Sequence, residues 1–183
     1  SSGKRTGLLM SIVMRLRSCL LVLLVVPLMV MHPQLTRAQV SGHSLAESAR
    51  SVRRIIAHRG SSADRPENTR AAYERAIQAG ATAIETDVTV ARDGRLVVMH
   101  DGTVDRTTNG SGPVGGLTLA ELKRLDAGSW FHPRFKKERV LTLREVLELC
   151  KGRVGVVVDS KEDGAGMVAK MIAEIQRYGD PKE

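Results

Sequence analysis

The sequence predicts an α/β fold, the N-terminal half of a TIM-type (β/α) barrel. Strand patterns alternate with helix patterns along the chain. Polar residues suited to catalysis follow the ends of several predicted strands, as they do in barrel enzymes. Only four strands can be counted in the 183 residues, whereas a complete barrel has eight strands and about 250 residues.

Residues 1–38 have the layout of a secretory signal peptide. A basic segment at 14–17 precedes a 13-residue apolar run at 19–31, and cleavage is expected after Ala38. The apolar run is shorter than the roughly 20 residues of a membrane-spanning helix, so an uncleaved anchor is the less favoured alternative. We expect an exported protein, periplasmic or extracellular, with no stable membrane span after cleavage and a polar linker at 39–52.

The net charge of +8 comes largely from this leader. Five of the 28 basic residues lie in 1–38, which holds no acid, so the remaining 23 basic and 20 acidic residues leave +3. With no dense basic run and few aromatic residues, a nucleic-acid partner is not expected.

The chain does not begin with methionine, so translation is expected to start at Met10 or Met14. Outside the leader, Cys150 is the only cysteine, which predicts a buried structural thiol and no internal disulfide.

The first predicted strand, residues 53–57, is followed by a helix. Pro66 opens this helix, its apolar pattern continues to Ala79, and Gly80 ends it. The next segment, residues 81–90, alternates apolar and polar side chains and is typical of a strand.

A hairpin-like turn at 92–94 then leads into a third strand at 95–99. Residues 103–116 are rich in Thr, Gly and Asn and predict a loop. Two Thr-x-x-Glu capping boxes predict helices at 118–126 and 142–152.

The apolar run 154–159 predicts a fourth strand that is buried on both faces. A last amphipathic helix is predicted at 165–178 and ends at Gly179. Together these elements make one domain at 53–183, which we expect to be truncated at its C-terminal end. Expressed alone, half a barrel exposes unpaired strand edges, so we expect this chain to be aggregation-prone and inactive.

An acidic pair marks the strand at 81–90. Glu85 and Asp87 lie two residues apart, so their side chains share one face. Two ionised carboxylates repel each other unless a cation lies between them, and such oxygen ligands suit Mg²⁺ or Ca²⁺. Asp159 ends an apolar run and would gain a partner from the same ion. The alternatives are a solvated edge-strand face for the pair and an exposed strand end for Asp159.

Two histidines follow predicted strands. His58 comes after 53–57, and His100 after 95–99. An imidazole has an ordinary pKa of about 6.5, so one copy can accept a proton while the other donates one. Arg59 and Lys161 offer positive charge to an anion, and the planar fork of Arg59 matches phosphate oxygens. The set is suited to cleaving a phosphodiester; a surface ion pair is the alternative role for Arg59.

Six motifs occur in the order and at the spacings of one enzyme family. They are His58-Arg59-Gly60, Pro66-Glu67-Asn68-Thr69, Glu85-Thr86-Asp87, His100-Asp101, Asp105-Arg106-Thr107-Thr108-Asn109-Gly110 and Leu125-Asp126-Ala127-Gly128-Ser129-Trp130-Phe131. Through them, residues 55–161 closely resemble the N-terminal part of the glycerophosphodiester phosphodiesterase domain.

The resemblance implies a TIM-type barrel with a small insertion after its third strand, at about residues 102–141. It also implies hydrolysis of small glycerophosphodiesters to glycerol 3-phosphate and an alcohol, with one divalent cation, Ca²⁺ or Mg²⁺. The implied roles are general acid/base catalysis by His58 and His100, metal binding by Glu85 and Asp87, phosphate binding by Arg59, and a supporting polar network that includes Glu67.

The fourth strand departs from the family pattern. Val158-Asp159-Ser160-Lys161 stands where the family usually has Ile-Glu-Ile-Lys, with the glutamate as third metal ligand. Asp159 is one methylene shorter, so the ion must lie closer or a water must intervene. Related barrels that cleave sphingomyelin or lysophospholipids can use aspartate there. A lysophospholipase D or sphingomyelinase D-like phosphodiesterase is therefore the alternative activity, and a non-catalytic phospholipid-headgroup-binding barrel is the alternative class.

Overall fold

The computed structural model describes residues 51–179, all within one compact unit at 43–183. The predicted signal peptide, its start site and most of the predicted linker lie outside the described residues. The elements are β1 (Ile56–Ala57), α2 (Arg70–Gln78), β2 (Ala83–Val90), β3 (Leu96–Val98), the 3₁₀ turn η1 (Val114–Gly116), α3 (Leu119–Leu122), the 3₁₀ turn η2 (Pro133–Phe135), α4 (Leu143–Cys150), β4 (Gly155–Ser160) and α5 (Ala165–Tyr178).

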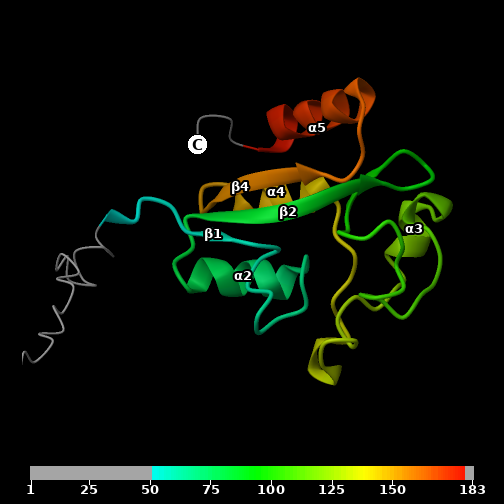
Figure 1. Ribbon diagram of the computed structural model, residues 1–183, viewed down its shortest axis with the longest axis horizontal. Helices are drawn as coiled ribbons and strands as arrows, with labels where there is room; N and C mark the ends of the chain where they lie inside the picture. Colours follow the sequence, from blue (N-terminus) through cyan, green and yellow to red (C-terminus); the bar gives the residue numbers. More distant parts are fainter. Residues whose placement is uncertain (1–50, 180–183) are drawn as a thin grey trace, which may run out of the picture. The chain divides into compact units, whose positions relative to one another are not determined.

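β2 is the centre of the sheet (Figure 1). β4 pairs in parallel with residues 83–88 of β2 along one edge. β1 pairs with residues 83–84, and β3 with residues 88–90, so both must lie along the opposite edge. Between β1 and β3 that edge has no strand partner beside residues 85–86, and the Asp87 carbonyl accepts a hydrogen bond from the Met99 N–H.

The predicted α/β class is confirmed, and so is the hairpin-like turn predicted at 92–94. β1 and β4 run parallel to β2, but the turn predicted at 92–94 reverses the chain, so β3 runs antiparallel. Gly94 takes a positive φ of 76° in this turn, a conformation that glycine adopts without steric cost. The sheet is consequently mixed instead of all parallel.

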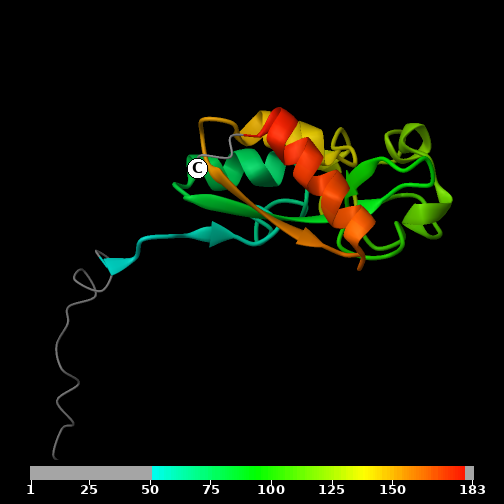
Figure 2. The same ribbon diagram turned by 90° about the horizontal axis from the view of Figure 1, so that it is seen from above.

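Helices α2, α4 and α5 cover one face of the sheet (Figure 2). Ile84 of β2 is fully buried in a cluster with Tyr73 of α2 and Val146 of α4. Val88 lies in a second cluster with Met171 of α5. Because side chains alternate along a strand, Glu85 and its neighbours two residues away point to the other face.

The segment at 102–141 forms a separate small core beside the hairpin of β2 and β3. Its buried cluster joins Val97 and Met99 to Val104, Leu122 and Val140. The predicted loop at 103–116 contains the turn η1, and α3 ends at Leu122, short of the predicted end at 126.

The helix predicted from Pro66 begins later, at Arg70. Thr69 is its N-cap, and the Thr69 hydroxyl accepts a hydrogen bond from the backbone N–H of Ala72. Asn68 has a φ of 58°, which no helical residue adopts. Glu67 and Asn68 therefore belong to the loop that faces β2, and not to the helix.

The expectation that β4 is buried on both faces is wrong. Val157 is 37% exposed, and Asp159 is exposed as well. Among the described residues, no strand pairs with the outer edge of β4, and the three helices cover only the face that carries Val156 and Val158.

Other local predictions are confirmed. Both capping boxes form, at Thr118 with Glu121 and at Thr142 with Glu145. The helix α5 has the predicted bounds, and Cys150 is buried at the end of α4. Burial raises the pKa of the Cys150 thiol to about 11, as expected of a structural cysteine. In the range 51–179, no helix is both long and apolar enough to cross a membrane.

Candidate active site

Three of the predicted site residues form an acidic cluster on the open face of β2 and β4. Asp87 and Asp159 are direct partners in the parallel pairing, and Glu85 is the partner of Val157. One carboxylate oxygen from each of the three acids lies within 4.8 Å of the others. Burial raises the pKa of Glu85, and the charge of Asp87 adds to this rise. The sequence prediction that these acids meet is therefore correct.

The environment of Asp87 tests whether a cation fits. Its side chain is only 1% exposed. Oδ2 accepts a hydrogen bond of 2.7 Å from Asn68 Nδ2. Oδ1 has the Lys161 ammonium at 2.8 Å but no hydrogen bond of acceptable geometry among the described residues. A buried carboxylate oxygen is costly without full compensation. A hard divalent cation with oxygen ligands would supply it, so the cluster fits Ca²⁺ or Mg²⁺.

Lys161 lies against the acidic cluster. Its Nζ is 2.8 Å from Asp87 Oδ1 and 2.6 Å from Asp159 Oδ2. Burial lowers the pKa of Lys161, but the hydrogen bond to Asp159 and the negative charges of Asp87 and Asp159 outweigh burial and leave the pKa raised. The ammonium is thus a permanent positive charge beside the three acids.

Arg59 reaches the acids from a strained turn. β1 ends at Ala57, and Arg59 and Gly60 then both take positive φ, 55° and 78°. A Cβ on Gly60 would lie 2.7 Å from the carbonyl carbon of Ala72, so only glycine fits there. The left-handed conformation costs Arg59 about 1–2 kcal/mol.

Contacts with three acids offset that cost. The Arg59 N–H donates to Glu85 Oε2 at 2.9 Å. Its Nη1 donates to Glu67 Oε1 at 3.1 Å, and its Nε is 3.3 Å from Asp87 Oδ2. The turn after β1 is therefore tied to the side chains of Glu85 and Asp87 on the open face of β2.

The two predicted catalytic histidines occupy different surroundings. His58 Nε2 is 4.0 Å from Glu85 Oε2, and the His58 side chain is 67% exposed. His100 is less exposed, and its Nδ1 is 2.7 Å from Asp101 Oδ1. The structure thus brings His58 to the acidic cluster directly, whereas His100 is connected to it through other charged residues.

Glu67, predicted as part of a supporting network, is the middle of that connection. Arg106 donates to both of its carboxylate oxygens, at 2.9 and 2.8 Å. Arg106 also donates to both oxygens of Asp101, at 2.7 and 3.0 Å. The hydrogen bond from Arg106 is the largest influence that lowers the pKa of Glu67. Sequence reasoning assigned no role to Arg106 or Asp101, although both lie in motifs that carry the family resemblance.

Asn68 is a further residue that sequence reasoning missed. Its Oδ1 accepts a hydrogen bond of 2.9 Å from the hydroxyl of Tyr73. That hydroxyl is also 2.7 Å from Thr86 Oγ1. Asn68 thus joins the helix-covered side of β2 to Asp87 on the open face. Its position beside Glu67 in Pro66-Glu67-Asn68-Thr69 was the available signal.

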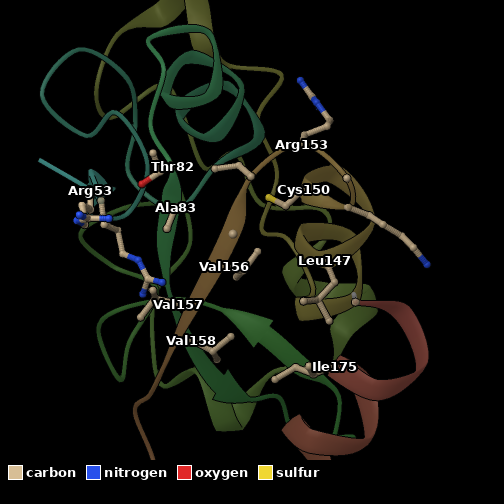
Figure 3. Close-up of a pocket in the computed structure, with 16 residues that line it drawn as sticks. Arg53, Thr82, Ala83, Leu147, Cys150, Arg153, Val156, Val157, Val158 and Ile175 are labelled. Atoms are coloured by element: carbon tan, nitrogen blue, oxygen red, sulfur yellow. The ribbon is translucent and has the colours of Figure 1, made fainter. Parts of the chain in front are cut away.

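A cavity of about 500 Å³ lies elsewhere, at the start of β4 (Figure 3). Apolar side chains of α4, β4 and α5 line it, with Arg53 and Arg153 at its rim. None of the predicted site residues lines this cavity, whereas Val154 to Val158 all do. The acidic cluster instead lies toward the C-terminal end of β4.

Comparisons with known proteins agree with this arrangement. Residues 58–171 match the sequence model of the Glycerophosphoryl diester phosphodiesterase family. A glycerophosphodiester phosphodiesterase of Caldanaerobacter subterraneus subsp. tengcongensis is 48% identical over 128 residues, which are 68% of this chain and 53% of that protein. This chain spans about half the length of the curated relatives it matches.

Two solved structures are similar in sequence and fold. The crystal structure of glycerophosphodiester phosphodiesterase from Agrobacterium tumefaciens str. C58 is 44% identical with a TM-score of 0.63, covering 69% of this chain and 55% of that one. An Oleispira antarctica phosphodiesterase in complex with the product sn-glycerol-3-phosphate is 35% identical with a TM-score of 0.66, covering 70% of this chain and 53% of that one.

Proposed function

The chain belongs to the glycerophosphoryl diester phosphodiesterase family, and from this premise we propose that the protein hydrolyses glycerophosphodiesters to glycerol 3-phosphate and an alcohol. The acidic cluster of Glu85, Asp87 and Asp159, whose oxygens lie within 4.8 Å of one another, is the observation that carries the proposal. His58 lies at its edge, 4.0 Å from Glu85. A relative of the same fold binds sn-glycerol-3-phosphate.

In this proposal the sheet is one part of a TIM-type (β/α) barrel. Helices cover one face of the sheet (Figure 2) and the acidic cluster lies on the other. This is the arrangement of a barrel wall, with the acids toward the interior. The similarity to two solved family members, at TM-scores of 0.63 and 0.66, supports it.

Glu85, Asp87 and Asp159 would hold one divalent cation, Ca²⁺ or Mg²⁺. The cation supplies Lewis-acid polarisation of a phosphoryl oxygen when it is bound. Arg59 and Lys161 bring positive charge to the same face for the phosphate. Both already form ion pairs with Asp87. Phosphate binding would therefore replace some of these ion pairs with contacts from Arg59 and Lys161 to the phosphate oxygens.

His58 and His100 would move the protons. One imidazole takes the proton from the attacking hydroxyl, of water or of the substrate's glycerol, as a new oxygen–phosphorus bond forms. The other gives a proton to the oxygen of the leaving alcohol as its bond to phosphorus breaks, and where the glycerol hydroxyl attacks, water then opens the cyclic phosphate. The exposed His58 has room for a substrate at Nε2. His100 has Nδ1 occupied by Asp101, which leaves its Nε2 for the substrate.

Hydrolysis of glycerophosphocholine by the full-length protein tests the proposal. His58→Ala and His100→Ala are each expected to lower kcat by about 10²–10⁴-fold, the range of general acid/base catalysis. His132→Ala is the matched control, because His132 is an exposed histidine of the insertion. A chelator should abolish activity, and added Ca²⁺ or Mg²⁺ should restore it. Full activity in either histidine variant would refute the acid/base pair.

Lysophosphatidylcholine and sphingomyelin belong in the same assay, because Asp159 replaces the glutamate usual in the family. Preference for either of them over glycerophosphocholine would shift the proposal to the lysophospholipase D or sphingomyelinase D-like class. Binding of these compounds without turnover would indicate a headgroup-binding barrel.

We also propose that the protein is exported through the segment at 1–38. The basic start, the apolar run and the small residues before the cleavage point support this. Mass spectrometry of the mature protein should find Gln39 at its N-terminus, and retention of residues 1–38 would contradict cleavage.

A further inference from the structure

An unbroken row of alternating charges leads from the acidic cluster to His100. Asp87 contacts Arg59, which contacts Glu67. Glu67 contacts Arg106, Arg106 contacts Asp101, and Asp101 contacts His100. The row joins the loops that follow β1 and β3, which carry the two histidines. Acid/base chemistry requires a defined orientation of each imidazole. The row of charges ends at the His100 ring and can fix its orientation.

The contact between Asp101 and His100 determines which ring nitrogen is free. The 2.7 Å separation between His100 Nδ1 and Asp101 Oδ1 is a short hydrogen bond. An ionised carboxylate can only accept, so Nδ1 carries the proton. A neutral ring then has its lone pair on Nε2, because the hydrogen bond at one nitrogen sets the state of the other.

Arg106 holds Asp101 in place for this contact. Its guanidinium donates four hydrogen bonds, two to Asp101 and two to Glu67, at 2.7 to 3.0 Å. The hydrogen bonds from Arg106 and then from His100 lower the pKa of Asp101, so its carboxylate remains ionised. A planar fork that satisfies two carboxylates has no equivalent in lysine, which is a single point charge.

We propose that Asp101 and Arg106 are positioning residues for His100, with Asp101 holding the ring by Nδ1–H and Arg106 fixing Asp101 against Glu67. This inference rests on the proposed function, in which His100 is one of the two acid/base groups. Neither residue touches the acidic cluster, so both act through His100.

The tautomer of His100 gives a readout that does not depend on activity. Two-bond ¹H–¹⁵N NMR of the full-length protein, at a pH where the ring is neutral, should find His100 protonated at Nδ1. In Asp101→Asn the amide can donate to Nδ1, so the proton should move to Nε2. Arg106→Gln should give a mixture of the two forms. A wild-type ring protonated at Nε2 would overturn the proposal, and so would the same tautomer in all three proteins.

Kinetics separate positioning from a purely structural role. Asp101→Asn and Arg106→Lys should lower kcat by about 10- to 100-fold, the cost of removing a hydrogen-bond partner that orients a functional histidine, with little change in KM. Arg106→Lys should have a Tm closer to that of the wild type than Arg106→Ala has, but its kcat should be almost as low as that of Arg106→Ala. Arg92→Lys is the matched control, since Arg92 pairs with Glu121 on the surface. If kcat falls only in proportion to the folded fraction, the ion pairs merely tie loops together.

The outcomes distinguish this inference from the proposed function. If the wild-type enzyme does not hydrolyse the substrate but His100 is protonated at Nδ1 as described, the proposed activity fails and the contact stands. If hydrolysis occurs and Asp101→Asn leaves both kcat and the tautomer unchanged, the activity stands and the positioning role is wrong.

Discussion

At the scale of single residues, Asn68 couples the site to the core. It stands at φ 58°, one residue before the N-cap of α2. Its amide donates to Asp87, and its carbonyl accepts from Tyr73. Asparagine tolerates the left-handed conformation better than other side-chain-bearing residues, because its short polar side chain bonds locally. Here one residue supplies both the backbone conformation and two hydrogen bonds.

Asn68→Ala is therefore expected to lower the free energy of unfolding by about 2–4 kcal/mol. The lost hydrogen bonds leave the buried Asp87 and Tyr73 short of partners, and alanine strains the left-handed backbone. Asn68→Gly loses the same hydrogen bonds but not the conformation, so it should be less damaging. Urea unfolding of the full-length protein measures both variants, and equal losses would show that backbone strain contributes nothing.

The lowered pKa of Glu67 leads to a prediction of how the free energy of unfolding depends on pH. The pKa of Glu67 is below its ordinary value of 4.5, chiefly because Arg106 donates to the ionised form. A lowered folded-state pKa means that the stabilisation is complete above the unfolded value and is lost as pH falls through the folded value. The free energy of unfolding should therefore fall below about pH 4.5, and less steeply in Glu67→Gln. Parallel pH profiles for the two proteins would contradict this.

Only the part of the candidate site that depends on the spacing of residues close together in the sequence could be predicted. Glu85 and Asp87 share a face because they are two apart on one strand, which the sequence alone establishes. Arg106 lies 39 residues beyond Glu67 and meets it only because the insertion folds back beside the turn after β1. No periodicity encodes such a contact, so its role became visible only in three dimensions.

At the scale of elements, the site depends on what β1 and β3 leave unpaired. β1 has only two residues, and β3 pairs further along β2. Between these two pairings, the loops that carry Arg59 and Asn68 contact the side chains of Glu85 and Asp87. The prediction of a helix from Pro66 overlooked this loop. Helix propensity does not reveal that Asn68 takes a left-handed φ, so that the loop continues to Thr69 and the helix begins only at Arg70.

The capping box of α4 should matter more than its exposed ion pair. Glu145 accepts from the backbone N–H and the hydroxyl of Thr142 and also pairs with Lys123. Glu145→Ala removes all three interactions and is expected to cost about 1 kcal/mol of unfolding free energy. Glu148→Ala, which removes only the exposed pair with Arg144, is the matched control and should cost much less. Equal losses in thermal or urea unfolding would contradict a role for the cap.

At the scale of the whole molecule, the sheet has a covered face and an open one. The covered face was predictable from apolar alternation, and the helices lie where that pattern requires. The exposure of β4 was not predictable, because an apolar strand looks the same whether or not other segments cover it. Val154 to Val158 were expected to be buried on both faces, yet Val157 is 37% exposed.

The open edge of β4 leads to the last prediction. A polypeptide of residues 53–183 produced alone should self-associate and be inactive, because an exposed apolar strand edge pairs with other chains. Val157→Lys places a charge on that strand and should shift sedimentation velocity toward smaller species. Val168→Lys, on the outside of α5 where Val168 is 45% exposed, is the matched control. If both variants help equally, general surface hydrophobicity drives association and the β4 edge has no special part in it. A soluble, monomeric and active wild-type polypeptide would refute the prediction altogether.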